Sequence, residues 1–167
     1  MFSPYSLPST FAEYDEYLGW RFHRVVANNT VAVRYLDTST GSMNNIIDIT
    51  YHGHVIATLW RNGDVDVSLR GDATPAETGY YRWGNPRSYV GASRTTITRV
   101  NAILGRRGHI RTVRYVPHIK LWRSAIVPFA SKNVISFRGN DVYIKDRVTG
   151  LTIESYTVHP NDVEAYV

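Results

Sequence analysis

Three things are scarce in this sequence: cysteine, long apolar runs and, over more than a third of its length, acidic residues. Without cysteine the chain has no disulfide, no thiolate zinc site and no cysteine nucleophile, which fits a reducing compartment. The apolar run at residues 125–130 is far shorter than the roughly 20 residues of a membrane-spanning helix. The first residues show no basic segment followed by an apolar one, so we expect no signal peptide and a soluble protein.

The acid-free segment runs from Thr78 to Asn140, and its 63 residues include twelve lysines or arginines. We call it the basic stretch. The whole chain has 19 basic and 14 acidic residues, so the basic stretch carries +12 and the rest, with 7 basic and 14 acidic residues, carries −7. One-sided charge costs self-repulsion in a folded protein and is usually found where a polyanion or an acidic partner neutralises it. The pattern favours binding over catalysis.

Arginine outnumbers lysine by 16 to 3, and aromatic residues are interspersed through the basic stretch. Guanidinium groups contact phosphates in a bidentate manner, and aromatic rings stack on unpaired bases. A GC-rich coding sequence also raises the arginine content, but codon bias does not separate charges of opposite sign. We predict a surface that binds nucleic acid or an acidic protein, formed by Arg94, Arg99, Arg106, Arg107, Arg111, Arg114, Tyr81 and Trp83.

For two of these residues the sequence leaves an alternative open. Arg106 and Arg107 directly follow a predicted helix. Cations at the carboxyl end of a helix also interact favourably with the helix dipole, without any ligand.

The N-terminal part of the chain predicts a helix at about residues 9–18. Thr10 and Glu13 have the spacing of a capping box, in which the threonine hydroxyl accepts a hydrogen bond from the main chain three residues later. Gly19 fits the end of this helix, because glycine readily adopts the positive φ that terminates many helices. The predicted apolar stripe consists of Phe11, Tyr14 and Leu18.

After this helix the pattern changes to strands, and we predict β-hairpins at about residues 30–70. The clearest hairpin joins residues 55–60 to residues 65–69, because apolar and polar residues alternate in its second strand. Between the two strands, Asn62-Gly63 predicts a type I′ turn, which needs positive φ at both central residues.

Residues 71–92 are rich in glycine, proline and aromatic residues and predict a long insertion loop. Loops of this length are often functional. A second helix follows at about residues 93–104, with Ser93 as its cap. We expect its apolar stripe to be Ile97, Val100 and Leu104, and its exposed side to carry Arg94, Thr95, Thr98 and Arg99.

The C-terminal part, residues 109–158, predicts further β structure. We expect strands at residues 109–116, 121–127, 134–137, 142–145 and 151–158. The prediction is a single domain, residues 1–167, of the α+β class. It is mostly antiparallel β, as a sheet or a small barrel, with an N-terminal helix and one internal helix.

Two histidines, His52 and His54, lie on one side of a predicted strand, and Asp48 precedes the first by four residues. They are weak candidates for a metal site, because a structural zinc site needs four ligands and the sequence suggests no other. No nucleophile elbow and no other set of converging catalytic residues is evident. We therefore expect no cofactor and keep a metal-dependent hydrolase as the weakest functional hypothesis.

Four short motifs follow one another between about residues 50 and 145. They are Tyr51-His52, the turn Asn62-Gly63, the segment Thr95-Thr96-Ile97-Thr98-Arg99-Val100-Asn101, and Trp122. In this order they resemble a family of small uncharacterised proteins encoded by phages of actinobacteria, although that family usually has a Gly-Gly-Trp block where this chain has residues 71–92. The resemblance implies no known activity. It implies a phage gene whose product acts in the cytoplasm of a bacterial host, with a place in the virion as the alternative.

The leading hypothesis is a non-enzymatic phage accessory protein that binds nucleic acid, or a nucleic-acid-associated host complex, through the basic stretch. The alternative is a protein–protein module, either a virion component or an inhibitor of a host enzyme. In that case an acidic host protein would neutralise the basic stretch, or the oppositely charged parts of two copies would pair and form a homo-oligomer. Neither hypothesis involves a membrane.

Overall fold

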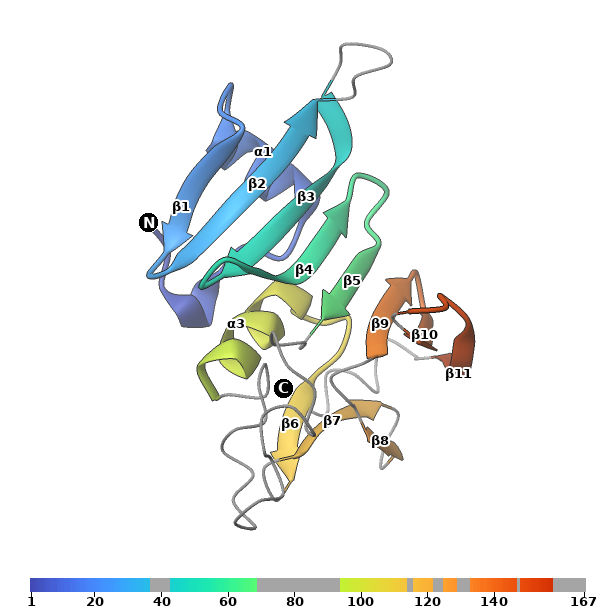
Figure 1. The fold of residues 1–167 in the computed structure, drawn as a ribbon. Coiled ribbons are helices and arrows are strands. Elements are labelled where there is room, and N and C mark those ends of the chain that lie inside the picture. Colours follow the sequence, from blue (N-terminus) through green and yellow to red (C-terminus); the bar gives the residue numbers. More distant parts are fainter. Residues whose placement is uncertain are drawn as a thin grey trace.

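The computed structural model describes residues 1–36, 43–68, 94–113, 116–121, 125–128, 133–146 and 148–157. The predicted fold class is confirmed, because most described elements are antiparallel strands and the main sheet is open (Figure 1). The insertion loop predicted at residues 71–92 and its neighbour Ser93 lie outside the described residues. The helices among the described residues are η1 (Pro4–Ser6), α1 (Phe11–Leu18) and α3 (Arg94–Leu104).

The main sheet has eight strands, all paired antiparallel, in the order β1-β2-β3-β4-β5-β9-β10-β11. Its strands are β1 (His23–Ala27), β2 (Thr30–Leu36), β3 (Met43–Tyr51), β4 (His54–Trp60), β5 (Val65–Ser68), β9 (Asn133–Arg138), β10 (Asp141–Asp146) and β11 (Thr152–Thr157). The first five strands form a meander, and the last three join its open edge through the long-range pair β5–β9.

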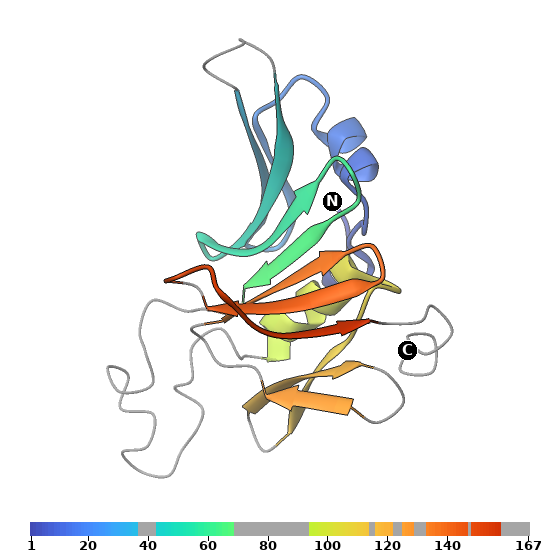
Figure 2. The ribbon, with the colours of Figure 1, turned by 90° about the vertical axis from the view of Figure 1, so that its right-hand side faces the viewer.

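A second sheet has three strands and lies below β9–β11 in Figure 2. Its strands are β6 (Ile110–Val113), β7 (Val116–Leu121) and β8 (Ala125–Pro128). The predicted strand boundaries are wrong here: residues 109–116 include the end of one strand and the start of the next, and so do residues 121–127. Neither Arg114-Tyr115 nor residues 122–124 contain glycine, proline, asparagine or aspartate, and Ser124 is their single turn-favouring residue, so the sequence gives only a weak turn signal where these strands separate.

The core forms on one face of the main sheet. Two rows of inward side chains cross it from strand to strand, and the buried residues of α1 and α3 belong to the same apolar cluster. Because strand residues alternate between faces, the residues between those rows lie on the opposite face, which we call the outer face. The first core row is Ala32, Ile49, Ala57, Val67, Ile135 and Ile144. The second core row is Arg34, Ile47, Leu59, Val65, Phe137 and Val142.

Helix α1 is as the sequence predicts. The Thr10 hydroxyl oxygen accepts a hydrogen bond from the Glu13 N–H at 3.2 Å, and the hydroxyl donates to the Glu13 carboxylate at 2.8 Å. Gly19 ends the helix with φ 61°, and its N–H donates to the Asp15 carbonyl at 3.0 Å. The three residues of the predicted apolar stripe are buried: Phe11, Tyr14 and Leu18.

Arg34 in β2 holds the carboxyl end of α1 against the sheet. It stands in a core row and is only 5% exposed. Its guanidinium pairs with Asp15 and donates to the carbonyls of Gly19 and, at 3.1 Å, Arg21. Gly19 and Arg21 directly follow the helix, so Arg34 fastens the chain where it leaves α1, whereas Arg24 donates to the last-turn carbonyl of Tyr17 at 2.8 Å.

The turn prediction for the β4–β5 hairpin is wrong, although the hairpin itself and its alternation are confirmed. Gly63 has φ 99° but Asn62 does not have positive φ, and the Gly63 N–H donates to the Trp60 carbonyl at 3.0 Å. These contacts describe a three-residue loop that ends in a glycine bulge. The hairpin with positive φ at both central residues is β3–β4, at His52 (50°) and Gly53 (80°).

The C-terminal half of the main sheet agrees with the sequence more closely than the second sheet does. The predicted strands 134–137 and 142–145 lie within β9 and β10, and the turn between them contains Gly139 with φ 62°. No helix in the described parts of the chain is long and apolar enough to cross a membrane.

We expect Thr10→Ala to lower the free energy of unfolding by about 1 kcal/mol, because the Glu13 N–H at the start of α1 loses its acceptor. Thr10→Ser keeps the hydroxyl and serves as the matched control. Urea denaturation followed by circular dichroism measures both variants. If alanine and serine leave the protein equally stable, the cap contributes nothing.

Candidate interaction surfaces

Four basic residues of the basic stretch have described side chains, and they differ in their surroundings. Arg99 is buried, Arg107 and Arg138 are partly buried, and Arg106 is exposed. For Arg94 at the start of α3 and Arg111 in β6, only the main chain is described. The remaining predicted contact residues lie outside the described residues: Arg114, Tyr81 and Trp83.

The predicted exposed position of Arg99 is wrong, because its side chain is only 5% exposed. Nε donates to the Thr30 hydroxyl at 2.8 Å, and the terminal nitrogens donate to the carbonyls of Thr95 and Asn28, each at 3.0 Å. The guanidinium also lies 4.0 Å from the centre of the Tyr51 ring. Two nitrogens of Arg99 therefore join α3 to the turn between β1 and β2, and the third binds a carbonyl of α3 itself.

Arg99 was predicted to be exposed because the buried face of α3 includes polar residues as well as aliphatic ones. Thr96, Arg99, Val100 and Ile103 are all buried, and they follow the i, i+3, i+4, i+7 spacing of one helix face. Arg99 is polar, so a search for apolar periodicity assigned it to the exposed side.

Arg107 follows α3, and its guanidinium lies at the carboxyl end of that helix, where a favourable interaction with the helix dipole is the alternative to ligand binding. One terminal nitrogen donates to the Ser9 carbonyl at 2.6 Å and lies 3.4 Å from the carbonyls of Ile103 and Leu104. Burial lowers the pKa of the Arg107 guanidinium from its ordinary value, while the charge of Asp64 and other carboxylates opposes that shift. Arg107 therefore joins the end of α3 to the segment before α1.

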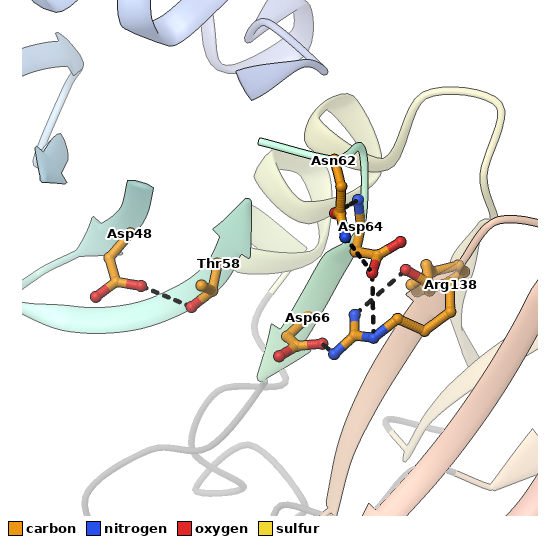
Figure 3. A network of polar contacts seen from close by, with 7 residues as sticks. Asp48, Thr58, Asn62, Asp64, Asp66 and Arg138 are labelled. Carbon is orange, nitrogen blue, oxygen red and sulfur yellow. Dashed lines mark hydrogen bonds and ion pairs between the residues drawn. The ribbon is translucent and has the colours of Figure 1, made fainter. Parts of the chain in front are cut away.

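The outer face of the main sheet carries a row of mostly polar residues that lie far apart in the sequence. One row runs across all eight strands. Near its middle, the Thr58 hydroxyl donates to an Asp48 carboxylate oxygen at 2.6 Å (Figure 3). The members of the row are His23, Val33, Asp48, Thr58, Asp66, Ser136, Tyr143 and Ser155.

Arg138 in β9 contacts two carboxylates of the neighbouring β4–β5 hairpin. Its Nη2 lies 2.9 Å from Asp66 Oδ1, and its Nε lies 3.4 Å from Asp64 Oδ2 (Figure 3). Asn62 holds Asp64 in place, because its Nδ2 donates to Asp64 Oδ2 at 3.1 Å and its Oδ1 accepts from the Asp64 N–H at 3.0 Å. The acidic pair after the turn therefore neutralises a basic residue more than 70 positions away in the chain.

Tyr35 in β2 adds a hydroxyl group to the polar surface of the outer face. Its side chain is 45% exposed. Partial burial raises the pKa of the Tyr35 hydroxyl, and so do the charge of Asp48 and a hydrogen bond to its carboxylate. Asp48 thus accepts a hydrogen bond from Thr58 and acts electrostatically on the Tyr35 hydroxyl.

The metal-site candidates do not come together. His52 is exposed at the β3–β4 turn, His54 begins β4, and Asp48 binds Thr58 in the middle of the sheet. Within the part of the chain that the structure describes, no three histidine or acidic side chains gather in a way that could hold a metal ion.

A scan against protein-family models found no family that matches the chain, and searches of curated proteins and of solved structures found no match. The resemblance to phage proteins therefore stays a prediction. The charge distribution along the sequence and the contacts of the described side chains are the features that bear on function.

We expect Arg99→Gln to lower the free energy of unfolding by about 3 kcal/mol, because three hydrogen bonds from a buried cation are lost and their acceptors stay buried. Arg106→Gln makes the same charge change at an exposed site near the end of the same helix and should change stability by less than about 0.5 kcal/mol. Urea denaturation compares the two. Equal losses would show that Arg99 is no anchor.

Proposed function

We propose that the protein is a non-enzymatic accessory protein, encoded by a phage, that binds nucleic acid or a nucleic-acid-associated host complex through the basic stretch. The observation that carries the proposal is the separation of charge along the chain. When Arg99, Arg107 and Arg138 are subtracted as internal contacts, the basic stretch still contributes nine positive charges and no negative one. Charge of one sign at this density is typical of polyanion-binding proteins.

The contacts of the described arginines leave fewer residues for the proposed nucleic-acid surface than the sequence predicts. The guanidinium groups of Arg99 and Arg107 already bind main-chain carbonyls, so neither enters the proposed surface. Arg106 is exposed at the end of α3, and β6 with Arg111 follows it directly. The proposed phosphate contacts are Arg94, Arg106, Arg111 and Arg114, with Tyr81 and Trp83 stacking on bases.

The resemblance to small phage proteins supports the proposed origin, and it supplies no activity of its own. The motif that carries most of that resemblance includes Arg99 and Asn101, and both have structural roles here. Asn101 Nδ2 donates to the Ile110 carbonyl, and Asn101 Oδ1 accepts from the Ile110 N–H, each at 2.7 Å. The motif therefore helps to build the fold around the basic stretch.

The test is fluorescence anisotropy with labelled single-stranded DNA, duplex DNA and RNA over a salt series. Each phosphate contact contributes a log–log slope of roughly 0.7 on single strands, so Arg106→Gln with Arg111→Gln should reduce the slope by about 1.4. The control variant, Arg21→Gln with Lys145→Gln, removes the same charge outside the basic stretch and should leave the slope unchanged. Absence of binding at low salt, or equal effects of both variants, would contradict the proposal.

A second candidate function is a protein–protein module, and the outer face favours it. Three side chains with large apolar surfaces are exposed on this face: Val25 (48%), Tyr35 (45%) and Val55 (40%). The same face carries the carboxylates of Asp48 and Asp66, which gives the mixture of apolar and polar groups common in interfaces.

If the +12 and −7 parts of two copies pair, the mass measured by light scattering should rise as the salt concentration falls. A mass that stays at that of one chain, 19.0 kDa, across salt and protein concentration would argue against charge-driven assembly.

A further inference from the structure

Asn62 and Gly63 form the single Asn-Gly pair of the sequence, and both residues are exposed at the tip of the β4–β5 hairpin. The main-chain nitrogen that follows an asparagine can attack the side-chain amide carbon, which makes asparagine a thermolabile residue. Glycine leaves the path of attack open, because it has no Cβ and rotates freely. The pair therefore has a covalent chemistry in addition to its place in the turn.

The folded loop holds the attacking nitrogen away from the amide carbon. The Gly63 N–H donates to the Trp60 carbonyl at 3.0 Å, which closes a turn around Arg61 and Asn62. Such a three-residue loop is built on a type I turn, in which the third residue, here Asn62, has a ψ of about 0°. Attack requires the Gly63 nitrogen to lie near the plane of the Asn62 side-chain bonds, and this ψ rotates it out of that plane.

The side chain of Asn62 is fixed as well (Figure 3). Its Nδ2 donates to Asp64 Oδ2 at 3.1 Å, and its Oδ1 accepts from the Asp64 N–H at 3.0 Å. Arg138 Nε lies 3.4 Å from the same Asp64 oxygen, so β9 also holds this carboxylate. Both the attacking and the leaving nitrogen are therefore engaged, and the amide reacts only while the loop is locally open.

We propose that Asn62 is a deamidation site controlled by the β4–β5 loop. While the loop is open, the Gly63 nitrogen gives its proton to a solvent base and bonds to Asn62 Cγ. The Cγ–Nδ2 bond breaks, and the leaving nitrogen takes up a proton and departs as ammonia. Water then opens the five-membered ring at either carbonyl, which gives aspartate or isoaspartate at position 62 without oxidation or reduction.

The product adds a negative charge beside the outer face. A carboxylate at position 62 cannot donate to Asp64, and it places like charges next to each other, which is destabilising. Arg138 already faces Asp64 and Asp66, so one guanidinium would face three carboxylates. Because ammonia is lost to solvent, this change of charge runs in one direction. It does not depend on the proposed nucleic-acid contacts.

The test follows the conversion of Asn62 in the full-length protein, native and unfolded in urea, in a mildly alkaline buffer. Trypsin cuts after Arg61 and Arg70, and residues 62–70 contain Asn62 as their single amide side chain. Mass spectrometry of this peptide therefore reports the conversion, with an unincubated sample as the blank. We expect the native protein to convert at least about tenfold more slowly than the unfolded one, because the loop is open only transiently.

Asp64→Ala removes the carboxylate that holds Asn62 Nδ2. It should raise the native conversion rate by roughly fivefold, the value of one hydrogen bond, and leave the rate in urea unchanged. The matched control is Asp141→Ala, which removes a carboxylate that binds the Thr157 hydroxyl and should change neither rate. Equal rates in native and unfolded protein, or equal effects of the two variants, would show that the loop does not control the reaction.

Asn62→Asp reproduces the aspartate product and should lower the urea concentration at which half of the protein unfolds. Asn140→Asp makes the same change beside Asp141, in the exposed turn between β9 and β10, and should lower it less. Equal midpoints for these variants would refute the effect on the outer face. If Asn62 converts in neither native nor unfolded protein, it is not a modification site.

Discussion

The arrangement of the helices on the sheet depends on buried guanidinium groups that bind main-chain carbonyls. Arg34 reaches from β2 to the end of α1, and Arg99 reaches from α3 to the turn between β1 and β2. Arg107 joins the end of α3 to the residue before the α1 cap. Each side chain thus fastens a helix or its end to a segment distant in sequence.

Arginine suits these positions because it offers five N–H donors in a planar fork and stays charged when partly desolvated. A buried cation needs compensation, and each anchor finds it differently. Asp15 pairs with Arg34, and the Tyr51 ring covers Arg99. Arg107 keeps part of its surface in solvent, and Asp64 lies close enough to oppose the effect of burial. Removing an anchor would therefore leave several buried carbonyls without donors.

These internal contacts reduce the number of arginines in the basic stretch that can be assigned to a binding surface. A run without acidic residues suggests a surface covered by arginines, yet two of its arginines are fold anchors and a third pairs with Asp64 and Asp66. Composition shows how many cations there are and how they are distributed along the chain. Whether a particular cation faces a carbonyl, a carboxylate or solvent depends on elements brought together by the fold, so only the remaining charge supports a binding role.

Local signals in the sequence predicted the elements that depend on near neighbours. The Thr10–Glu13 cap, the apolar stripe of α1 and the alternation in β5 each involve residues within one or two turns or strands, and all are confirmed. Strand order, the β5–β9 pair and the Arg138 contacts join residues about 70 positions apart, for which one sequence contains no direct signal. The prediction of a type I′ turn at Asn62-Gly63 was wrong for a different reason. The same dipeptide fits a two-residue loop and a three-residue loop, and the hydrogen bond from the Trp60 N–H to the Asp64 carbonyl selects the three-residue loop.

That turn also determines which side of the sheet the Arg61 side chain contacts. A two-residue turn would place Arg61 and Asp64 opposite each other as the last strand pair, with Arg61 directed by the alternation of β4. The three-residue loop instead makes Trp60 and Asp64 the last pair, so Arg61 becomes a loop residue whose side chain binds Asn45 and covers Phe11. One additional loop residue thus separates Trp60, held in the sheet, from Arg61, held against α1. The end of this hairpin therefore contacts both sides of the sheet: Trp60 lies on the outer face near Arg138, and Arg61 lies against α1.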